Sequence, residues 1–246
     1  MAEPAPEAST GSPPAPPRWG LGDALGGFLV GLLVTSVVAS ACMAVDGAKE
    51  LTPGCQALSL AGLWVGLVGA PLLAARVKGS GRLSLDFGLR ARLGDAPLGL
   101  AVGVAGQTVL VPLVGWALQP VLGHPHVSQQ VKRLAGQAHG AGLVLLAVMV
   151  VVAVPVVEEL FFRGLLLRAI QHRLGNGWAV VLSAVAFGLA HLDATLSGAG
   201  QVLLVASLSA LGVVLAAMAV RTGRLGPGIW AHAGFNAVTL VLLAAR

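Results

Sequence analysis

Three charged residues lie inside one long apolar segment of this chain. The stretch VVAVPVVEELFFRGLLLR carries Glu158, Glu159 and Arg163. A charged side chain at the centre of a membrane helix costs roughly 2.5 to 3.5 kcal/mol even on a lenient insertion scale. Glu159 and Arg163 are four residues apart and can pair on one helical face, whereas Glu158 lies about 100° around the helix. Glu158 is therefore predicted to face another partner; the alternative is a purely structural cluster of ion pairs.

Two later apolar segments each carry a pair of residues at helical spacing. WAVVLSAVAFGLAHL places Phe187 and His191 four residues apart, and GIWAHAGFNAVTLVLLAA places His232 and Asn236 at the same interval. Residues at i and i+4 share a face of a helix, so the polar groups of the second pair project together. Both need hydrogen-bond partners in a membrane. Taken alone, a histidine in the position of His191 is more often a hydrogen-bonded packing residue than a catalyst.

The depth of these side chains indicates that they converge. At 1.5 Å per residue from the inner end of each segment, Glu158, His191, His232 and Asn236 all lie on the order of 12 to 20 Å deep. Pro155 lacks a backbone donor and is predicted to kink its helix and open space beside the carboxylates. Three helices are thus predicted to bring polar groups to one level.

One chemistry open to these residues is hydrolysis of a peptide bond by an activated water. Glu158 and His191 would hold and deprotonate the water, while His232 and Asn236 would donate hydrogen bonds to the oxyanion. Burial favours the protonated form of a carboxylate and a nearby cation favours its charged form, so Glu158 can be a competent base.

The alternative chemistry is a zinc site in which Glu158, His191 and His232 are the ligands and water takes the fourth position. The sequence lacks HExxH, the usual helical zinc spacing. An asparagine on the face of His232 also suits an oxyanion donor better than a metal ligand. We therefore favour a mechanism that requires no cofactor.

The composition predicts that a polytopic membrane protein holds these residues. The 246 residues are 56% hydrophobic and 10% charged, and the mean hydropathy is +0.86. A helix needs roughly 20 residues to cross a bilayer. The fold class is therefore an all-α transmembrane bundle of about seven helices, with the candidate site among the fourth, fifth and seventh. The predicted segments are 23–45, 54–75, 97–118, 141–170, 177–192, 202–220 and 228–245.

The N-terminal segment and the basic residues predict the order of domains and the orientation. Residues 1–20 are rich in Pro, Ala and Ser and lack the basic region of a signal peptide, which predicts a disordered cytoplasmic tail. A transmembrane domain follows at 21–246, with its catalytic core at about 141–246. A cytoplasmic N-terminus satisfies the positive-inside rule. The inner face then carries Arg18, Arg76, Lys78, Arg82, Arg90, Arg92, Arg168, Arg173, Arg221 and Arg224, and the outer face carries only Lys49, Lys132, Arg133 and Arg246.

The charge balance also bears on partners and source. The net charge is +5, but the basic residues sit beside apolar segments and form no long Lys/Arg stripe, which argues against nucleic acid. The expected partners are the lipid bilayer and a membrane-associated peptide or protein substrate. The bias toward Ala, Gly, Val, Leu and Arg favours a GC-rich bacterial source and hence the bacterial inner membrane.

Two cysteines and three loop histidines could form a disulfide and a metal site, but simpler interpretations are favoured for both sets. Cys42 and Cys55 flank the loop between the first two helices, and packing is favoured over a disulfide because such bonds need an oxidising compartment. Scattered solvated histidines are likewise favoured over a metal site for three residues of the outer loop, His124, His126 and His139.

Three short motifs resemble those of a known family. EELFFR at 158–163, FGLAH at 187–191 and HAGFN at 232–236 are similar, in order, to the EExxxR, FxxxH and HxxxN motifs of the CPBP (Abi) intramembrane proteases. That family includes the type II CAAX prenyl proteases. The similarity covers roughly residues 141–246, and no motif position departs from the pattern.

The resemblance implies a glutamate-type intramembrane endopeptidase, although the family is often labelled metalloprotease. It implies Glu158 as the water-activating residue assisted by His191, with His232 and Asn236 at the oxyanion. The supporting residues are Glu159, Arg163 and Phe187. Eukaryotic members cleave after a prenylated cysteine, and bacterial relatives include a myxosortase-like subgroup. The substrate stays open, as do two other functions: a non-catalytic membrane binding or immunity protein, and a proton-coupled transporter.

Overall fold

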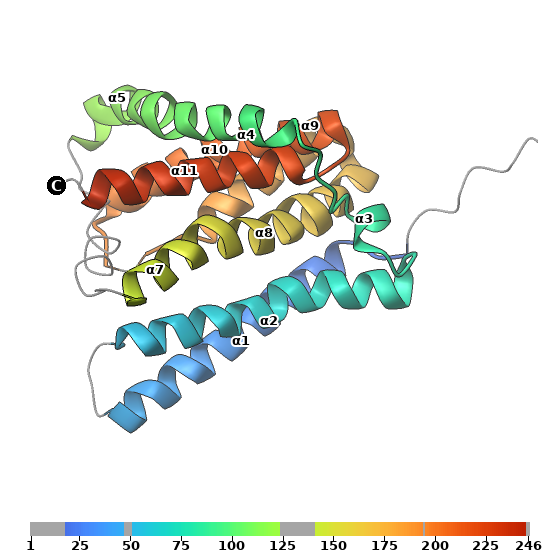
Figure 1. Cartoon of the computed structure of the whole chain (residues 1–246), viewed down its shortest axis with the longest axis horizontal. Helices are drawn as coiled ribbons and strands as arrows, with labels where there is room; N and C mark the ends of the chain where they lie inside the picture. Colours follow the sequence, from blue (N-terminus) through green and yellow to red (C-terminus); the bar gives the residue numbers. More distant parts are fainter. Residues whose placement is uncertain (1–17, 47–50, 124–140, 194, 245–246) are drawn as a thin grey trace, which may run out of the picture.

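The structure of this protein is a computed structural model that describes residues 18–46, 51–123, 141–193 and 195–244. Within these residues every regular element is a helix, which confirms the predicted all-α bundle (Figure 1). Several predictions fall outside the described residues: most of the tail at 1–17, the three loop histidines His124, His126 and His139, and the outer basic residues Lys49, Lys132, Arg133 and Arg246.

The first two helices form an antiparallel hairpin. Helix α1 spans Leu21–Asp46 and α2 spans Pro53–Lys78. Glycines allow the two backbones to approach closely, because a Cβ on Gly66 would come 2.7 Å from Cα of Gly31. Small residues of this kind are typical of helix contacts in membranes.

Cys42 and Cys55 form a disulfide at one end of this hairpin, so the interpretation of both as packing residues is wrong. The antiparallel pairing brings their Cα atoms to 5.9 Å, within the range that a disulfide requires. The sequence could not show this distance, because glycine contacts such as Gly31 with Gly66 set the register of the two helices.

The third span begins after the short helix α3, Leu83–Asp86. It runs without interruption from Asp95 to Leu122. Its parts are α4 (Asp95–Ala105), the π-helical η1 (Gly106–Leu110) and α5 (Val111–Leu122).

The fourth and fifth predicted helices follow each other directly in the chain and are separated by one sharp turn. Together they comprise α7 (Ala141–Val148), η2 (Met149–Ala153), α8 (Val154–Glu159), η3 (Leu160–Leu166) and α9 (Leu167–Leu189). The turn lies at Gly175, inside α9, between the two helices that the sequence predicts.

The last two helices are joined by a tight turn. Helix α10, Gly198–Thr222, starts at Ser197, whose Oγ accepts from the backbone N–H of Gly200 at 3.1 Å. It ends at Gly223, which has a left-handed φ of 66°. Helix α11, Gly226–Ala244, follows and packs along α4.

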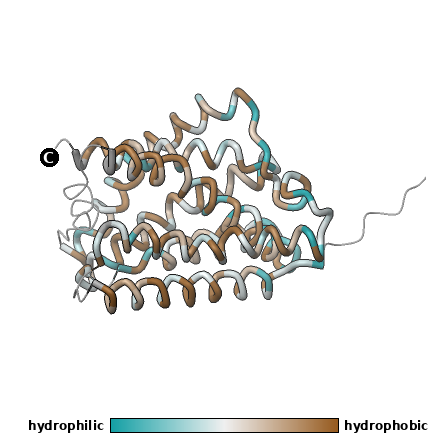
Figure 2. The backbone as a smooth tube through the Cα atoms, turned by 60° about the horizontal axis from the view of Figure 1, so that its bottom comes forward, coloured by the Kyte–Doolittle hydropathy of each residue, from teal (hydrophilic) through white to brown (hydrophobic). Residues whose placement is uncertain are grey.

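The described helices fit a membrane in length and surface. Four of them are long and apolar enough to cross it: Leu21–Val45, Gly54–Lys78, Asp95–Leu122 and Gly198–Thr222. Figure 2 shows hydrophobic residues along the lengths of the helices and hydrophilic ones gathered mainly toward their ends. Many leucines and valines face outward, as expected of a surface in contact with lipid.

Candidate active site

The chain reverses direction at Gly175, and this turn brings two predicted site residues together. Gly175 has a φ of 77°, which favours glycine because it has no Cβ. Glu158 lies about 25 Å of helix before the turn and His191 lies about 24 Å after it. Because the two arms are nearly equal in length, the turn returns His191 to the level of Glu158.

The helix that carries the two glutamates is irregular on both sides of them. The π-helical η2 ends just before Pro155, and η3 begins directly after Glu159. Proline has no N–H to bond to the carbonyl one turn earlier, so a local change of helical register beside it is expected. Segments of π-helix are frequent at functional sites. The irregularity predicted at Pro155 therefore takes the form of a π-helical turn.

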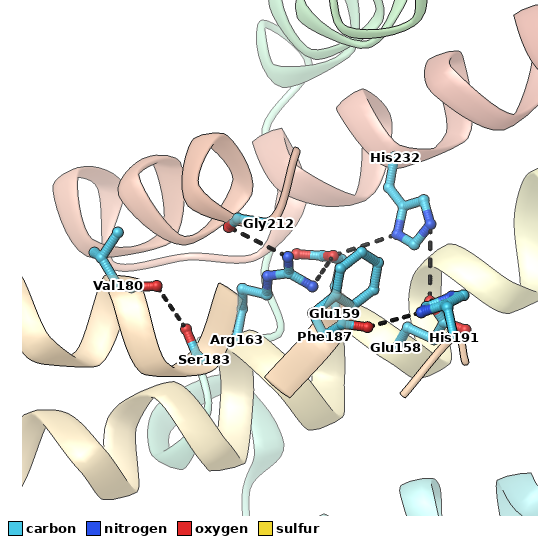
Figure 3. A network of polar contacts seen from close by, with 9 residues as sticks. All are labelled: Glu158, Glu159, Arg163, Val180, Ser183, Phe187, His191, Gly212 and His232. Atoms are coloured by element: carbon cyan, nitrogen blue, oxygen red, sulfur yellow. Dashed lines mark hydrogen bonds and ion pairs between the residues drawn. The ribbon is translucent and has the colours of Figure 1, made fainter. Parts of the chain in front are cut away.

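Glu158 lies where two histidine rings converge (Figure 3). Its Oε2 is 3.8 Å from Nε2 of His191 and also 3.8 Å from Nε2 of His232. This oxygen is buried and has no hydrogen-bond partner among the described residues. A water that bridged either 3.8 Å pair would lie about 2.8 Å from both of its atoms.

Both histidines are oriented through their other ring nitrogen. Nδ1 of His191 is 2.8 Å from the backbone oxygen of Phe187, and Nδ1 of His232 is 3.3 Å from Oε1 of Glu159. A carbonyl oxygen and a carboxylate accept, so both Nδ1 atoms donate. In its neutral form each ring then presents an unprotonated Nε2 toward Glu158, as a proton acceptor must.

Glu159 and Arg163 form the buried ion pair that their spacing predicts. Nη1 of Arg163 is 3.0 Å from Oε1 of Glu159, and both side chains are at most 1% exposed. Nη2 of Arg163 donates to the backbone oxygen of Gly212 on α10 at 3.3 Å. The pair therefore ties the glutamate helix to α10 and supplies a positive charge within the site.

Phe187 is the aromatic centre of the cluster and is completely buried. The guanidinium carbon of Arg163 lies 4.3 Å from its ring centroid, a cation–π distance. The centroids of the His191 and His232 rings lie 4.8 and 5.6 Å from it, both at edge-on angles. One ring thus packs against the cation and both imidazoles.

Asn236 is anchored to a backbone carbonyl. Its Nδ2 donates to the oxygen of Val150 at 2.8 Å. That oxygen is without its usual helical partner, because the N–H of Val154 bonds to Met149. Pro155, the next residue along, has no N–H to offer. Asn236 therefore satisfies an acceptor that the π-helical turn leaves free, and its second amide hydrogen stays available.

The predicted zinc ligands Glu158, His191 and His232 come together, but not at zinc-binding distances. Within the part of the chain that the structure describes, no group of three or more His, Cys, Asp or Glu side chains is arranged to hold a metal ion. Two ligands of a tetrahedral zinc bound at about 2.0 to 2.1 Å lie roughly 3.4 Å apart. The 3.8 Å separations exceed this, so the side chains as placed do not fit zinc.

Three backbone carbonyls belong to the site and were not predicted from the sequence. They are those of Val150, Phe187 and Gly212. Every residue has a carbonyl, so residue type carries no signal for them. The one available signal was Pro155, which predicts a free acceptor about one turn earlier.

The three side chains around the Glu158 carboxylate oxygen differ in exposure. The side chain of His191 is 31% exposed, whereas those of Glu158 and His232 are 11% and 4% exposed. His191 follows the C-cap of α9 at Ala190, where the helix gives way to a turn. Of the three side chains, that of His191 is therefore the most accessible from outside the bundle.

Comparison with known proteins shows a similarity to one family over part of the chain. Residues 140–238 match the family described as type II CAAX prenyl endopeptidase Rce1-like. The matched segment contains all the predicted site residues and agrees with the resemblance of the three motifs. No curated protein and no solved structure matches the chain.

Proposed function

We propose that this chain, whose residues 140–238 match the Rce1-like family of type II CAAX prenyl endopeptidases, hydrolyses a peptide bond of a membrane-associated protein or peptide. One observation carries the proposal: two imidazole Nε2 atoms converge at 3.8 Å on the same unpartnered carboxylate oxygen of Glu158. Such an arrangement holds and deprotonates a water.

In the proposed reaction Glu158 is the general base and His191 helps to orient the water. The water oxygen attacks the peptide carbonyl carbon while its proton passes to Oε2 of Glu158. The carbonyl oxygen becomes an oxyanion. That proton then moves to the departing nitrogen, the C–N bond breaks, and an acid and an amine leave. General base catalysis of this kind contributes typically about 10² to 10⁴ in rate.

The oxyanion is proposed to lie near His232 and Asn236. Asn236 supports this role with the amide hydrogen that Val150 does not take. His232 becomes a second donor when its Nε2 carries a proton, and Glu159 holds its ring through Nδ1. Removal of one oxyanion donor costs about 10² to 10³ in kcat in known hydrolases. We expect the loss for Asn236→Ala to fall in this range.

The proposed chemistry is metal-independent, and the substrate is left to experiment. The test is cleavage by purified full-length protein in detergent of two peptides, one with a prenylated CAAX end and one with an unmodified transmembrane anchor. Wild type is compared with Glu158→Gln and His191→Ala, each with and without a chelator. Asp193→Asn is the matched control, because it removes a carboxylate two residues from His191 that contacts Thr195.

Each outcome of this test has a distinct meaning. Cleavage by wild type and Asp193→Asn, but not by the two site variants, supports the proposal, and indifference to chelator supports the metal-free form. Restoration by zinc after chelation would replace it with the metal mechanism. Cleavage by Glu158→Gln at the wild-type rate would refute the site. A Glu158→Gln protein that still replaces wild type in cells would favour the non-catalytic binding or immunity function, and proton flux in vesicles would favour transport.

We also propose that the N-terminus is cytoplasmic in a bacterial inner membrane. Lys78, Arg168 and Arg224 lie at one end of the bundle, and the Cys42–Cys55 disulfide lies at the opposite end of the α1–α2 hairpin. Disulfides persist in oxidising compartments and basic residues gather on the inner face. In a chain without native cysteines, Ser80→Cys should react with an impermeant maleimide only after permeabilisation. Reaction in intact cells would invert the orientation.

A further inference from the structure

Basic residues dominate the end of the bundle at which α2 ends and α9 begins. The acidic residues described there are each already engaged. Asp23 pairs with Lys78 at 2.6 Å, and Asp95 pairs with Arg224 at 2.6 Å. The third, Asp86, accepts the backbone N–H of Ser80 at 3.0 Å. Among the described acidic residues at this end, Asp23 and Asp95 are thus paired with cations, and Asp86 is bonded to the backbone and hydroxyl of Ser80.

Arg90 and Arg168 are two cations of this end without an acidic partner. None of the ion pairs among the described residues includes either of them. The guanidinium of Arg168 lies against the loop that carries Arg90, because a Cβ on Gly88, two residues before Arg90, would collide with its Nη2. Arg168 uses Nη2 to bond the backbone oxygen of Gly223 at 3.0 Å, while its Nε has no partner. Two neighbouring like charges with no counter-charge favour an anion between them.

The backbone around Arg168 is shaped to hold this side chain. Gly88 has a φ of 69°, and a Cβ there would collide with Nη2 of Arg168 and with the oxygen of Gly223. The same oxygen accepts from Arg168. The neighbouring turn is fixed to this loop, because the N–H of Leu225 donates to Gly88 and that of Gly226 donates to Arg90. Hydrogen bonds therefore hold both the backbone of Arg90 and the side chain of Arg168 beside this turn.

A third basic group lies one helical turn beyond Arg168. His172 is four residues along α9 and so shares its face. The ring of Trp19 packs against that of His172 with centroids 5.1 Å apart. Trp19 is itself 5% exposed, and its Nε1 has no hydrogen-bond partner among the described residues. Partial burial and the charge of Arg168 lower the pKa of His172, which a bound anion would offset.

We propose that Arg90, Arg168 and His172 form a binding site for a phosphate group, which at the membrane surface belongs to an anionic lipid. Guanidinium groups match phosphate oxygens in geometry and charge. Clusters of basic residues beside membrane helices attract anionic headgroups. Arg224 provides an internal contrast, since its bidentate contact with Asp95 already satisfies it. The site lies outside the proposed peptidase centre and does not depend on its chemistry.

The test measures lipid binding to the full-length chain by native mass spectrometry in neutral detergent. The probes are phosphatidylglycerol, phosphatidylcholine and inorganic phosphate. Arg90→Gln is the decisive variant, because the Arg90 side chain is exposed and has no partner to lose. Arg82→Gln is the control, because it removes the same charge from an exposed residue nearby. Arg168→Lys tests the guanidinium without removing the charge.

We expect wild type and Arg82→Gln to bind phosphatidylglycerol with the same affinity. Arg90→Gln should bind it at least roughly tenfold more weakly, because that is the loss typical of one charge-assisted hydrogen bond. Arg168→Lys should also weaken binding, and phosphatidylcholine should bind weakly to every variant. Competition by inorganic phosphate that depends on Arg90 would support the site. It would identify free phosphate, rather than a lipid headgroup, as the ligand. Equal binding of phosphatidylglycerol by Arg90→Gln and Arg82→Gln would overturn the proposal.

Discussion

Nδ1 of His232 lies 3.3 Å from Oε1 of Glu159, the same oxygen that pairs with Arg163 at 3.0 Å. One buried carboxylate oxygen therefore fixes the ring of a histidine of the candidate active site and compensates a buried cation. The two tasks cannot be separated by a single substitution at this position. In the proposed mechanism, stability and catalysis are therefore coupled through Glu159.

We expect Glu159→Gln to destabilise the protein strongly. Gln has no charge to compensate Arg163, and removal of one partner of a buried ion pair costs about 3 to 5 kcal/mol. The measurement is unfolding of the purified protein in mixed micelles. Asp86→Asn, which alters a carboxylate at the surface end, should unfold nearly as wild type does. Equal stability of the two variants would contradict the importance of the pair.

Phe187→Leu should reduce catalysis more than stability. Leucine keeps the backbone carbonyl that orients His191 but loses the cation–π contact with Arg163 and both edge contacts with histidine. We expect kcat to fall roughly tenfold or more, because small displacements of catalytic groups are costly. Phe28→Leu is the control, since that ring packs on Phe161 outside the site. Equal kcat values for the two variants would exclude a positioning role for Phe187.

Gly103→Ala should displace the helix that carries His232. A Cβ on Gly103 would come 2.7 Å from the backbone nitrogen of Phe235, and backbone cannot rotate away. Overpacking of this kind costs typically about 1 to 3 kcal/mol. Gly115→Ala, on the same span, meets open space and should be neutral or slightly stabilising. The check is the unfolding midpoint and kcat of both variants, and no difference between them would contradict close α4–α11 packing.

His172 should make stability depend on pH. Its pKa in the folded protein is lowered from 6.5 by partial burial and by Arg168. The unfolded chain therefore takes up the proton first as the pH falls below 6.5, and the free energy of unfolding decreases until the folded pKa is passed. His172→Gln should reduce the change in the unfolding midpoint between pH 7.5 and pH 5. Identical profiles for wild type and His172→Gln would disprove this contribution.

Hydropathy and helical spacing predict much of this fold because the membrane restricts the choices. Seven apolar segments correspond to helices, and the break at Gly175 falls between the fourth and fifth. The spacing of Glu159 and Arg163 predicts their pair for the same reason: a buried charge in lipid has few alternatives.

What the sequence does not predict depends on helix register and backbone irregularity. The Cys42–Cys55 bridge follows from the register of α1 against α2. The contact of Asn236 with Val150 follows from a π-helical turn, which hydropathy cannot show. Spacing places His232 and Asn236 on one face, but only the packed helices show that Glu159 takes one ring nitrogen.

The turn at Gly175 makes the candidate site sensitive to the number of residues in each arm. Deletion of one residue between the turn and His191 would shorten that arm by about 1.5 Å and rotate the histidine by about 100°. Hydrophobicity and helix content would hardly change. A natural or engineered chain with such a deletion would insert and fold much as this one does, yet its two arms would no longer meet at Glu158. Length variation among related sequences should therefore be confined to the loops outside 158–191.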